Sequence, residues 1–447
     1  MRIHFIAIGG SIMHNLAIAL QRGGHHVTGS DDEIYEPSRS RLESNGLLPQ
    51  EIGWDPASIT PEMDAVILGM HARPDNPELQ RAIDLEIPVF SFPEFVAGQC
   101  QDKTRIVVAG SHGKTTTTSM IMHVLRTCDY DFDYLVGAQL PGFDLMVRLS
   151  DAPVVVIEGD EYLSSPVDQR PKFVHYDPHL LVITGIAWDH MNVFPTIENY
   201  IDQFRQLLVS LQPTASVFAC GEDARLRQLV IEAGHEDGLY RAFAHRHTSH
   251  GAEAVVDDRS YPVQFFGRHN FENLQAAWLV CRELNVSLGA FLGAMQSFSG
   301  AAMRLDKLLE RDDLIVYRDF AHAPSKVAAT VAAVRARHPD QAITACLELH
   351  TFSSLNQAFM PQYLGTMDPA DHAHVFYSPH TLQMKKLPPV APEFVRECFG
   401  GAARIHTSMD RLIDALPLPL RGVHLWMSSG RFGGLDFGAL YSGQEGG

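Results

Sequence analysis

Residues 105–127 read RIVVAGSHGKTTTTSMIMHVLRT, and this stretch constrains the fold more than any other part of the chain. A β-branched run leads into a glycine turn with Gly-Lys-Thr, and the residues after it favour a helix. A strand, a glycine-rich loop and a helix in this order bind phosphate, because backbone N–H groups and the helix N-terminus face the anion. Such a loop follows a strand of a parallel sheet, so the stretch predicts an α/β domain.

The loop is shorter than the usual phosphate-binding loop, which places four residues between its first glycine and the Gly-Lys-Thr. Here only Ser111 and His112 separate Gly110 from Gly113. The alternative is an ordinary glycine turn before a helix, but such a turn does not require the strand, the Gly-Lys-Thr and the helix to coincide. We therefore expect these four residues to bind nucleotide phosphates.

The next three residues carry the charge and the hydroxyl groups that a nucleotide site needs. Lys114 is expected to neutralise the β- and γ-phosphates, and the hydroxyl of Thr115 to bind Mg²⁺. Thr116 continues the first helical turn, where N–H groups favour an anion. ATP and Mg²⁺ are therefore the expected cofactors.

Acidic residues and a histidine follow two further predicted strands. VVVIEGDE delivers Glu158 at a strand end, and LVITGIAWDH delivers Asp189 and His190 in the same way. Open α/β sheets place ligands at the carboxyl ends of their strands. Each residue alone could be a solvated loop residue, but their shared position favours a metal cluster, in which histidine is an unusual ligand for Mg²⁺.

The whole chain alternates short β-branched runs with amphipathic helical segments, a rhythm that predicts parallel sheets covered by helices. The expected strands are 3–8, 26–30, 66–68, 89–90, 105–109, 154–157, 180–184, 215–218, 314–317, 343–346, 374–376 and 423–427, and the expected helices include 12–21, 270–283 and 287–298. At 447 residues the chain is too long for one core. We expect three α/β domains, 1–102, 103–299 and 300–447.

Composition excludes several classes of function. The net charge of −18 argues against a nucleic-acid binder, whose footprint is basic. Six scattered cysteines without a CxxC pair argue against a disulfide framework or a zinc site and favour a reducing, cytoplasmic environment. The short apolar run at the N-terminus does not match a signal peptide, and no apolar stretch is long enough to span a membrane.

Several motifs in one order resemble the Mur ligase family, the ATP-dependent amide-forming enzymes of bacterial cell-wall synthesis. They are AGSHGKTTTT, EGDEY, DHMNVF, GRHNFENLQAA and RDFAHAPSK, with HFIAIGGSIMHNLAIAL near the start and LWMSSGRFGGL near the end. The resemblance implies a Rossmann-like N-terminal domain that binds UDP, a central P-loop ATPase-type parallel sheet and a Rossmann-like C-terminal domain. It also makes the short loop a family trait.

The resemblance implies roles for the residues around ATP. Lys114 would contact the phosphates, Thr115 and Glu158 would hold one Mg²⁺, and His190 would hold a second one nearer the acyl group. Several relatives carry a carbamylated lysine there. This chain has no lysine between Lys172 and Lys307, and the expected place falls near Arg205, so His190 with substrate oxygens or water would complete the shell.

The resemblance also assigns the nucleoside and the remaining phosphate contacts. Asn270, with His269 beside it, would read the adenine, because an amide both donates and accepts; a helix N-cap is the alternative for Asn270. Arg304 would reach the ATP phosphates from the third domain. Asp319 would accept the ribose hydroxyls, with His322 beside the phosphates.

The first domain is expected to bind the UDP part of a sugar nucleotide. Gly9, Gly10 and Ser11 form its first strand-to-helix turn, and Asp31 follows its second strand. His71, after the third predicted strand, is assigned to the same site. The glycine pair alone is weak support, because an ordinary tight turn also explains it.

Within the family, DEYLSSPVDQRPKFVHYDP resembles the branch that joins UDP-N-acetylmuramate to the tripeptide L-alanyl-γ-D-glutamyl-meso-diaminopimelate in peptidoglycan recycling. The expected reaction forms an acyl phosphate that the peptide amine attacks. The alternatives are the branch that adds free L-alanine, a kinase-like phosphotransferase and a sugar-nucleotide-binding protein without ligase activity. Peptide recognition is the open point, because ELHTFSSLNQAF, which contains His350, replaces an arginine-containing run.

Overall fold

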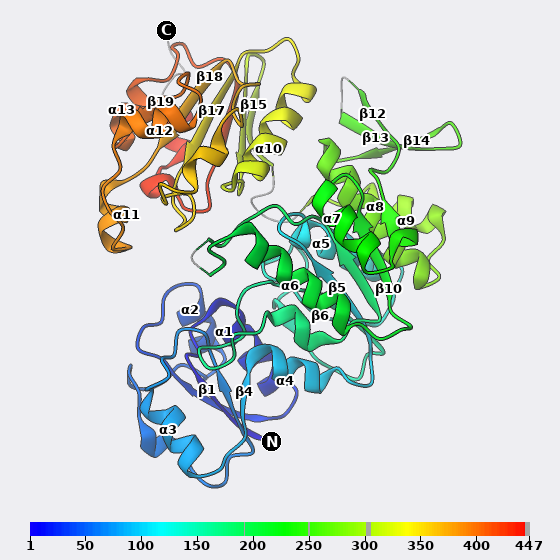
Figure 1. Ribbon diagram of the computed structural model, residues 1–447, viewed down its shortest axis with the longest axis vertical. Coiled ribbons are helices and arrows are strands. Elements are labelled where there is room, and N and C mark those ends of the chain that lie inside the picture. Colours follow the sequence, from blue (N-terminus) through cyan, green and yellow to red (C-terminus); the bar gives the residue numbers. More distant parts are fainter. Residues whose placement is uncertain (192, 249–250, 301–304, 443–447) are drawn as a thin grey trace.

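The computed structural model describes residues 1–191, 193–248, 251–300 and 305–442. Its α/β units follow one another along the long axis of the molecule, with the N-terminal unit at one end and the C-terminal unit at the other (Figure 1). The α/β fold class with parallel sheets predicted from the sequence is confirmed. In the part of the chain described, none of the helices combines the length and apolar character of a membrane span.

The N-terminal sheet has the order β2-β1-β3-β4, and all neighbouring strands are parallel. Its elements are β1 (Arg2–Ile6), α1 (Ser11–Arg22), β2 (His26–Ser30), α2 (Ser38–Ser44), η1 (Pro56–Ser58), β3 (Ala65–Leu68), α3 (Pro77–Asp84), β4 (Val89–Ser91) and α4 (Phe92–Gln99). The strand order reverses between β1 and β3, and such a switch point opens a crevice at the carboxyl edge of the sheet.

The central sheet has the order β11-β10-β9-β5-β8-β6-β7, so β5 lies between β8 and β9. Its elements are β5 (Thr104–Ala109), α5 (Lys114–Thr127), β6 (Asp133–Leu135), β7 (Val147–Arg148), β8 (Val154–Glu158), η2 (Lys172–Tyr176), β9 (Leu180–Ile183), α6 (Ile197–Ser210), β10 (Ser216–Cys220), α7 (Ala224–Glu232), η3 (Glu236–Gly238), β11 (Leu239–Tyr240), α8 (Arg268–Glu283) and α9 (Leu288–Met295). The last four residues of β5, 106–109, are apolar and buried, as expected for a strand covered on both faces, and Arg105 before them is buried and pairs with Asp177.

The register of this sheet positions the functional loops. Val108 of β5 pairs with Glu158 of β8, and Ala109 pairs with Ile183 of β9. The loops after β8 and β9 therefore begin on either side of the loop after β5. The proposed boundary near residue 102 lies between the end of α4 and the start of β5.

A small antiparallel sheet of β12 (His245–Thr248), β13 (Gly251–Val256) and β14 (Arg259–Val263) was not expected from the sequence. Its second hairpin turns at Asp257 and Asp258, which have φ values of 46° and 61°. Two consecutive positive φ values suit a two-residue hairpin, and aspartate tolerates this conformation better than most residues. The pair of aspartates between two short strands was the signal that sequence reasoning missed.

The C-terminal sheet has the order β15-β16-β20-β17-β18-β19, with only β15 antiparallel to its neighbour. Its elements are β15 (Asp306–Arg311), β16 (Leu314–Asp319), α10 (Pro324–Arg337), β17 (Ile343–Glu348), η4 (Met360–Tyr363), β18 (His372–Phe376), α11 (Pro379–Met384), α12 (Pro392–Cys398), β19 (Arg404–His406), α13 (Met409–Asp414), β20 (Gly422–Met427), η5 (Phe432–Gly434) and α14 (Phe437–Ser442). Separate apolar clusters cover the two faces of this sheet.

Candidate active site

The loop between β5 and α5 has the conformation that its glycines permit. Gly110 has φ of 123° and Gly113, the N-cap of α5, has φ of 76°. A Cβ atom at Gly110 would collide with Thr184, and one at Gly113 would collide with Asn273. Both positions therefore require glycine, for the backbone conformation as well as for space.

Lys114, the first residue of α5, turns its ammonium group toward the loop after β8. Its Nζ donates to the carbonyl of Gly110 and pairs with Oε2 of Glu161, each over 2.6 Å. Burial alone would lower the pKa of Lys114, but the negative charges of Glu161 and Asp160 outweigh it and raise that pKa. Lys114 is therefore a fixed cation beside the loop.

Thr115 and Glu158 lie together, as a shared metal site requires. The Thr115 hydroxyl donates to Oε1 of Glu158 over 2.8 Å, and the backbone N–H of Gly137 donates to the other carboxylate oxygen over 2.9 Å. The carboxylate is thereby oriented toward the first turn of α5. One hydroxyl and one carboxylate at this place suit Mg²⁺, which prefers oxygen ligands and keeps several waters.

A second group of potential ligands consists of Asp160, Glu161 and His190, whose ligand atoms all lie within 4.8 Å of one another. Nε2 of His190 is 3.6 Å from Oε1 of Glu161. Burial would raise the pKa of Asp160, but Lys172 and Lys114 hold it well below its usual range. Asp160 and Glu161 each pair with a lysine over 2.6 Å, so a cation bound here would share these carboxylates with Lys172 and Lys114.

Glu161 is one of the functional candidates that sequence reasoning missed. Its side chain is completely buried, contacts Lys114 and His190, and accepts a hydrogen bond of 2.8 Å from the Tyr200 hydroxyl. The signal was present in the EGDE run, where Glu158 ends the strand. Glu161, three residues after Glu158, reaches Lys114 because the loop after β8 turns back toward the phosphate loop.

Asp189 is a buried anion at the junction with the C-terminal domain. Its Oδ2 lies 3.6 Å from Nζ of Lys326, and its Oδ1 accepts the N–H of His190 over 2.8 Å. Burial would raise the pKa of Asp189, but Lys326 and His190 hold it well below its usual range. A carboxylate with so low a pKa is a weak base, so the side chain is better suited to orienting a cationic group than to accepting a proton.

A cavity of about 300 Å³ opens over the loop and extends to the C-terminal domain. Among the predicted nucleotide-binding residues, its lining includes Ser111, His112, Gly113, Lys114, Thr115, Thr116, Glu158, His269, Asn270 and Asp319. His322 lines a neighbouring pocket instead. Arg304 lies outside the described residues.

The far wall of this cavity comes from α8 and β16. Asn270 is the third residue of α8, and Gly267 is the N-cap, so the alternative role of Asn270 as N-cap is wrong. Asp319 ends β16 and accepts the backbone N–H groups of Leu305 and Ala321 over 2.7 Å each. Its carboxylate is thereby fixed at the carboxyl end of a parallel strand.

Histidines line the junction between the central and C-terminal domains. Nε2 of His112 is hydrogen-bonded to the Ser325 hydroxyl, while its buried Nδ1 has no hydrogen-bond partner in the described structure. Burial lowers the pKa of His112, and burial also lowers that of His269. Both rings are therefore neutral near pH 7.

In the N-terminal domain, the loops after β1 and β2 meet. The backbone N–H of Gly9 donates to Oδ2 of Asp31 over 2.7 Å, and burial raises the pKa of this carboxyl group. Gly10 is the N-cap of α1, and Ser11, its first residue, is exposed. His71 follows β3 and is also exposed.

Arg205 does not reach the proposed metal group. It lies on α6, is half exposed and pairs with Asp202 on the same helix over 3.1 Å. Tyr200, on the buried face of α6, is the residue that contacts Glu161. The resemblance places the carbamylated lysine of some relatives on α6, and in this chain α6 supplies the hydroxyl of Tyr200 instead.

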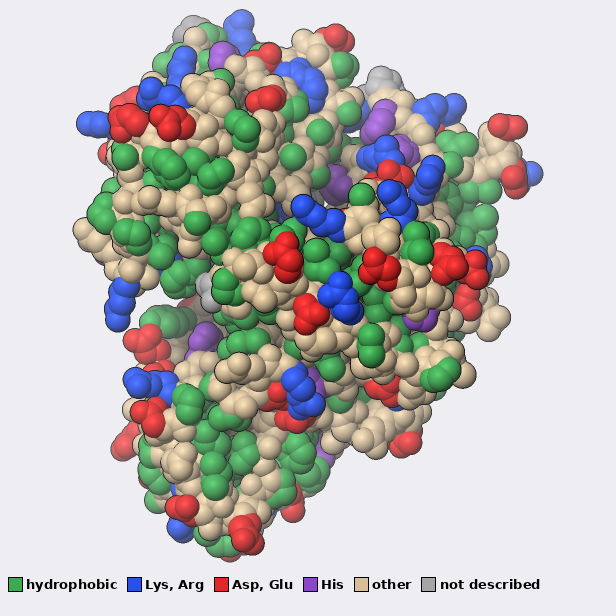
Figure 2. All heavy atoms as spheres, in the orientation of Figure 1, with side chains coloured by type: hydrophobic (Ala, Val, Ile, Leu, Met, Phe, Trp, Pro, Cys, Tyr) green, Lys and Arg blue, Asp and Glu red, His purple; other side chains and the backbone are tan. Residues whose placement is uncertain are grey.

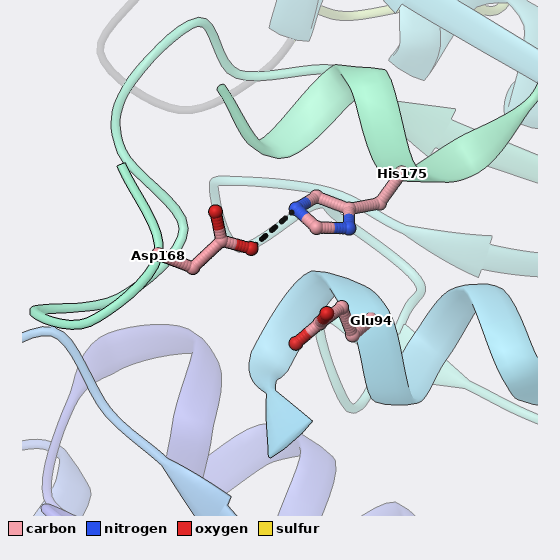
Figure 3. Close-up of side chains that lie close together, drawn as sticks. All are labelled: Glu94, Asp168 and His175. Carbon is pink, nitrogen blue, oxygen red and sulfur yellow. Dashed lines mark ion pairs between the residues drawn. The ribbon is translucent and has the colours of Figure 1, made fainter. Parts of the chain in front are cut away.

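A further group with metal-ligand chemistry joins the N-terminal and central domains: Glu94 on α4, Asp168 in the loop after β8 and His175 on η2 (Figure 3). Asp168 lies 3.3 Å from Nε2 of His175. The guanidinium of Arg170 pairs with Asp168 over 2.8 Å and with Glu94 over 3.2 Å. Because Arg170 already balances both carboxylates, the group is an ion-pair network between domains.

Comparisons with known proteins agree with this arrangement. The family model described as the Mur ligase middle domain matches residues 108–281. The family model described as the catalytic domain of the Mur ligase family matches residues 2–104. The UDP-N-acetylmuramate–L-alanyl-γ-D-glutamyl-meso-2,6-diaminoheptandioate ligase of Escherichia coli K12 is 30% identical over 97% of this chain and 96% of its own length.

Two other proteins are similar to this chain over most of its length. The UDP-N-acetylmuramate–L-alanine ligase of Desulforamulus reducens is 30% identical over 80% of this chain and 79% of its own length. The crystal structure of a murein peptide ligase from Psychrobacter arcticus superposes with a TM-score of 0.66 and 23% identity, covering 97% of both chains. The chain belongs to the Mur ligase family of ATP-dependent ligases.

Proposed function

We propose that this protein joins UDP-N-acetylmuramate to the tripeptide L-alanyl-γ-D-glutamyl-meso-diaminopimelate, with ATP and Mg²⁺, in peptidoglycan recycling. The similarity to the E. coli ligase over nearly the whole chain supports this substrate pair. We place the reaction in the cytoplasm, because all six cysteines are free thiols.

One observation carries the proposal: the ends of β8 and β9 contribute Glu158 and Thr184 to one pocket, and the loops that follow them contribute residues to a second. The first contains the phosphate loop and suits ATP. The second is lined by Asp189 and His190 together with residues of the C-terminal domain. A phosphotransferase needs a nucleotide and one acceptor, whereas a ligase must also position a nucleophile beside the activated group.

We assign the site residues from the family membership together with the pocket linings. The phosphates would be bound by Gly110, Ser111, His112, Gly113, Lys114, Thr115, Thr116 and His322, with Arg304; the nucleoside by His269, Asn270 and Asp319; and the UDP group by Gly9, Gly10, Ser11, Asp31 and His71. Thr115, Glu158 and His190 would hold Mg²⁺, with Asp160 and Glu161 added from the geometry. Bound Mg²⁺ would neutralise charge on the transferred phosphoryl group.

The reaction has two steps. The lactyl carboxylate of UDP-N-acetylmuramate attacks the γ-phosphorus, the bond to ADP breaks, and Lys114 stabilises the charge that develops on the phosphoryl oxygens. The peptide amine then attacks the acyl carbon, loses a proton and displaces phosphate to leave the amide. An α-amine with a pKa of about 7.7–8.0 needs little help to deprotonate.

The test measures ADP release with UDP-N-acetylmuramate and either the tripeptide or L-alanine. We expect turnover with the tripeptide and little with L-alanine. Turnover with L-alanine alone would reject the substrate assignment and leave the family assignment intact. The similarity to the D. reducens alanine ligase makes that enzyme activity the second candidate.

A further inference from the structure

The second pocket has a volume of about 270 Å³ and lies between the central and C-terminal domains. The residues that matter for its chemistry are Tyr162, Asp189 and His190 on the central side and His350, Phe352 and Lys385 on the C-terminal side. Figure 1 shows α11, which precedes Lys385, at the end of the C-terminal domain that faces the N-terminal domain, and in Figure 2 the surface below it is hollowed.

In the part of the chain that the structure describes, Lys385 has no acidic partner. Its Nζ lies 4.3 Å from the ring centroid of Phe352, and among the described residues it forms no ion pair. By contrast, Lys114 and Lys326, on the nucleotide side, both pair with carboxylates. Phe352 is 44% exposed, which is high for a phenylalanine, and its ring holds the ammonium group by a cation–π contact.

The segment that carries Phe352 is anchored to the loop after β9. The backbone N–H of Met191 donates to the Ser353 hydroxyl over 3.1 Å. At its other end, Nδ1 of His350 lies 3.8 Å from Glu348, a buried carboxylate that also accepts the N–H of Phe432 over 2.8 Å. The wall that presents Lys385 is thus tied to the residues beside the proposed acyl group.

Charge is distributed unevenly across the pocket. The central wall carries the carboxylate of Asp189, whose Oδ2 lies 3.6 Å from Nζ of Lys326. The C-terminal wall carries the ammonium group of Lys385. A nucleophile with an amine at one end and a carboxylate at the other matches this polarity, because each end meets the opposite charge.

We propose that Lys385 binds a carboxylate of the incoming nucleophile and selects a peptide whose carboxylate is remote from its amine. This inference rests on the proposed ligase function. In free L-alanine one carbon separates the two groups, whereas three extended residues span about 10 Å. Because Asp189 and Lys385 lie on walls from different domains, separated charges fit the pocket better than adjacent ones.

The test compares Lys385→Gln with Lys385→Arg and with Lys386→Gln. Lys386 is the exposed neighbour and does not line the pocket. We expect Lys385→Gln to raise the KM for the tripeptide about 10- to 100-fold, the loss expected when a charged hydrogen bond is removed. The KM values of Lys385→Gln for ATP and UDP-N-acetylmuramate should stay within about twofold of those of the parent. Lys385→Arg should recover most of the affinity for the tripeptide. Lys386→Gln should have the same KM for the tripeptide as the parent.

A second measurement uses tripeptides in which one carboxylate at a time is amidated. Amidation of the carboxylate that Lys385 binds should weaken the parent enzyme as much as Lys385→Gln does and should have little effect on that variant. Equal KM values in Lys385→Gln and Lys386→Gln would overturn the inference. The inference would also be overturned if every amidation raised the KM of Lys385→Gln as much as it raises that of the parent. A rise in the KM for ATP as large as that for the tripeptide would overturn it as well.

Failure of the proposed function gives a different pattern. If the parent enzyme uses L-alanine and not the tripeptide, the substrate assignment is wrong, and the KM for L-alanine then tests Lys385. An increase of this KM in Lys385→Gln would retain carboxylate binding by Lys385 and reject the preference for a remote carboxylate. An unchanged KM would reject both.

Discussion

The ammonium group of Lys114 lies 2.6 Å from the carboxylate of Glu161, so the lysine proposed to bind phosphate is paired with a buried acid from the loop after β8. The two residues are 47 positions apart and meet because β5 and β8 are adjacent strands. ATP phosphates must compete with Glu161 for Lys114, or share it with a cation held by Glu161. The pair therefore links phosphate binding to the proposed metal group.

Lys114→Ala should abolish ADP formation, lowering kcat at least about 10³-fold, because Lys114 contacts the phosphate loop directly, whereas Lys326, which also lines the cavity, pairs with Asp189. Binding of UDP-N-acetylmuramate should change less than about twofold, since the proposed UDP site lies in another domain. Steady-state ADP release and calorimetric titration with the sugar nucleotide measure the two effects. A parallel loss of sugar binding would show that the two sites are assigned wrongly.

The same variant should also be less stable, by about 3 kcal/mol for the central domain, because Glu161 loses its partner in a fully buried position. Adding Glu161→Gln should recover most of this loss without recovering activity. Thermal unfolding of the two single variants and the double variant forms the required cycle. Strict additivity of the two single effects would contradict the pairing.

Two histidines provide a matched comparison for the proposed metal site. His190→Gln should raise the Mg²⁺ concentration for half-maximal activity about tenfold, because His190 belongs to the group with Asp160 and Glu161. His175→Gln should leave this concentration unchanged, because Arg170 balances the carboxylates around His175. Magnesium titrations of ADP release at saturating ATP measure both, and equal shifts in the two variants would contradict the assignment.

The parts of this site that could be predicted from sequence are local in the chain. The loop after β5 and the strand ending at Glu158 each follow from a short pattern, since the conformation of a glycine turn or of a buried strand depends on neighbouring residues. Glu161 and Tyr200 could not be found in this way. Their contact depends on a loop that folds back and on which face of α6 is buried.

Lys385, like Glu161 and Tyr200, could not be predicted from neighbouring residues in the sequence. It follows a six-residue helix and belongs to no recognisable motif, so nothing in its surroundings along the chain indicates a ligand. Its proposed role arises from the approach of two domains, which places it in one pocket with His190. The run ELHTFSSLNQAF contains no arginine, and Lys385, directly after α11, is the cation that we propose for peptide recognition.

Acid pH should destabilise the C-terminal domain through two buried histidines on one face of its sheet. Burial, with the nearby charges of His406 and Arg404, lowers the pKa of His374 to about 4, and burial with the charge of His372 lowers that of His424 to about 4. Unfolding returns each pKa to about 6.5, so the unfolded chain binds more protons between these values. The contribution of each histidine to stability is therefore complete above about pH 6.5 and is lost progressively as the pH falls toward 4.

When the pH falls from 7 to 5, each of these histidines should lower the free energy of unfolding by about 2 kcal/mol. Urea unfolding followed at both pH values should show this loss, and His374→Gln should reduce it by about that amount. The exposed His380 on α11 provides the control, because His380→Gln should leave the pH dependence of the parent unchanged. A loss of the same size in His374→Gln and the parent would show that protonation of other groups governs the acid transition.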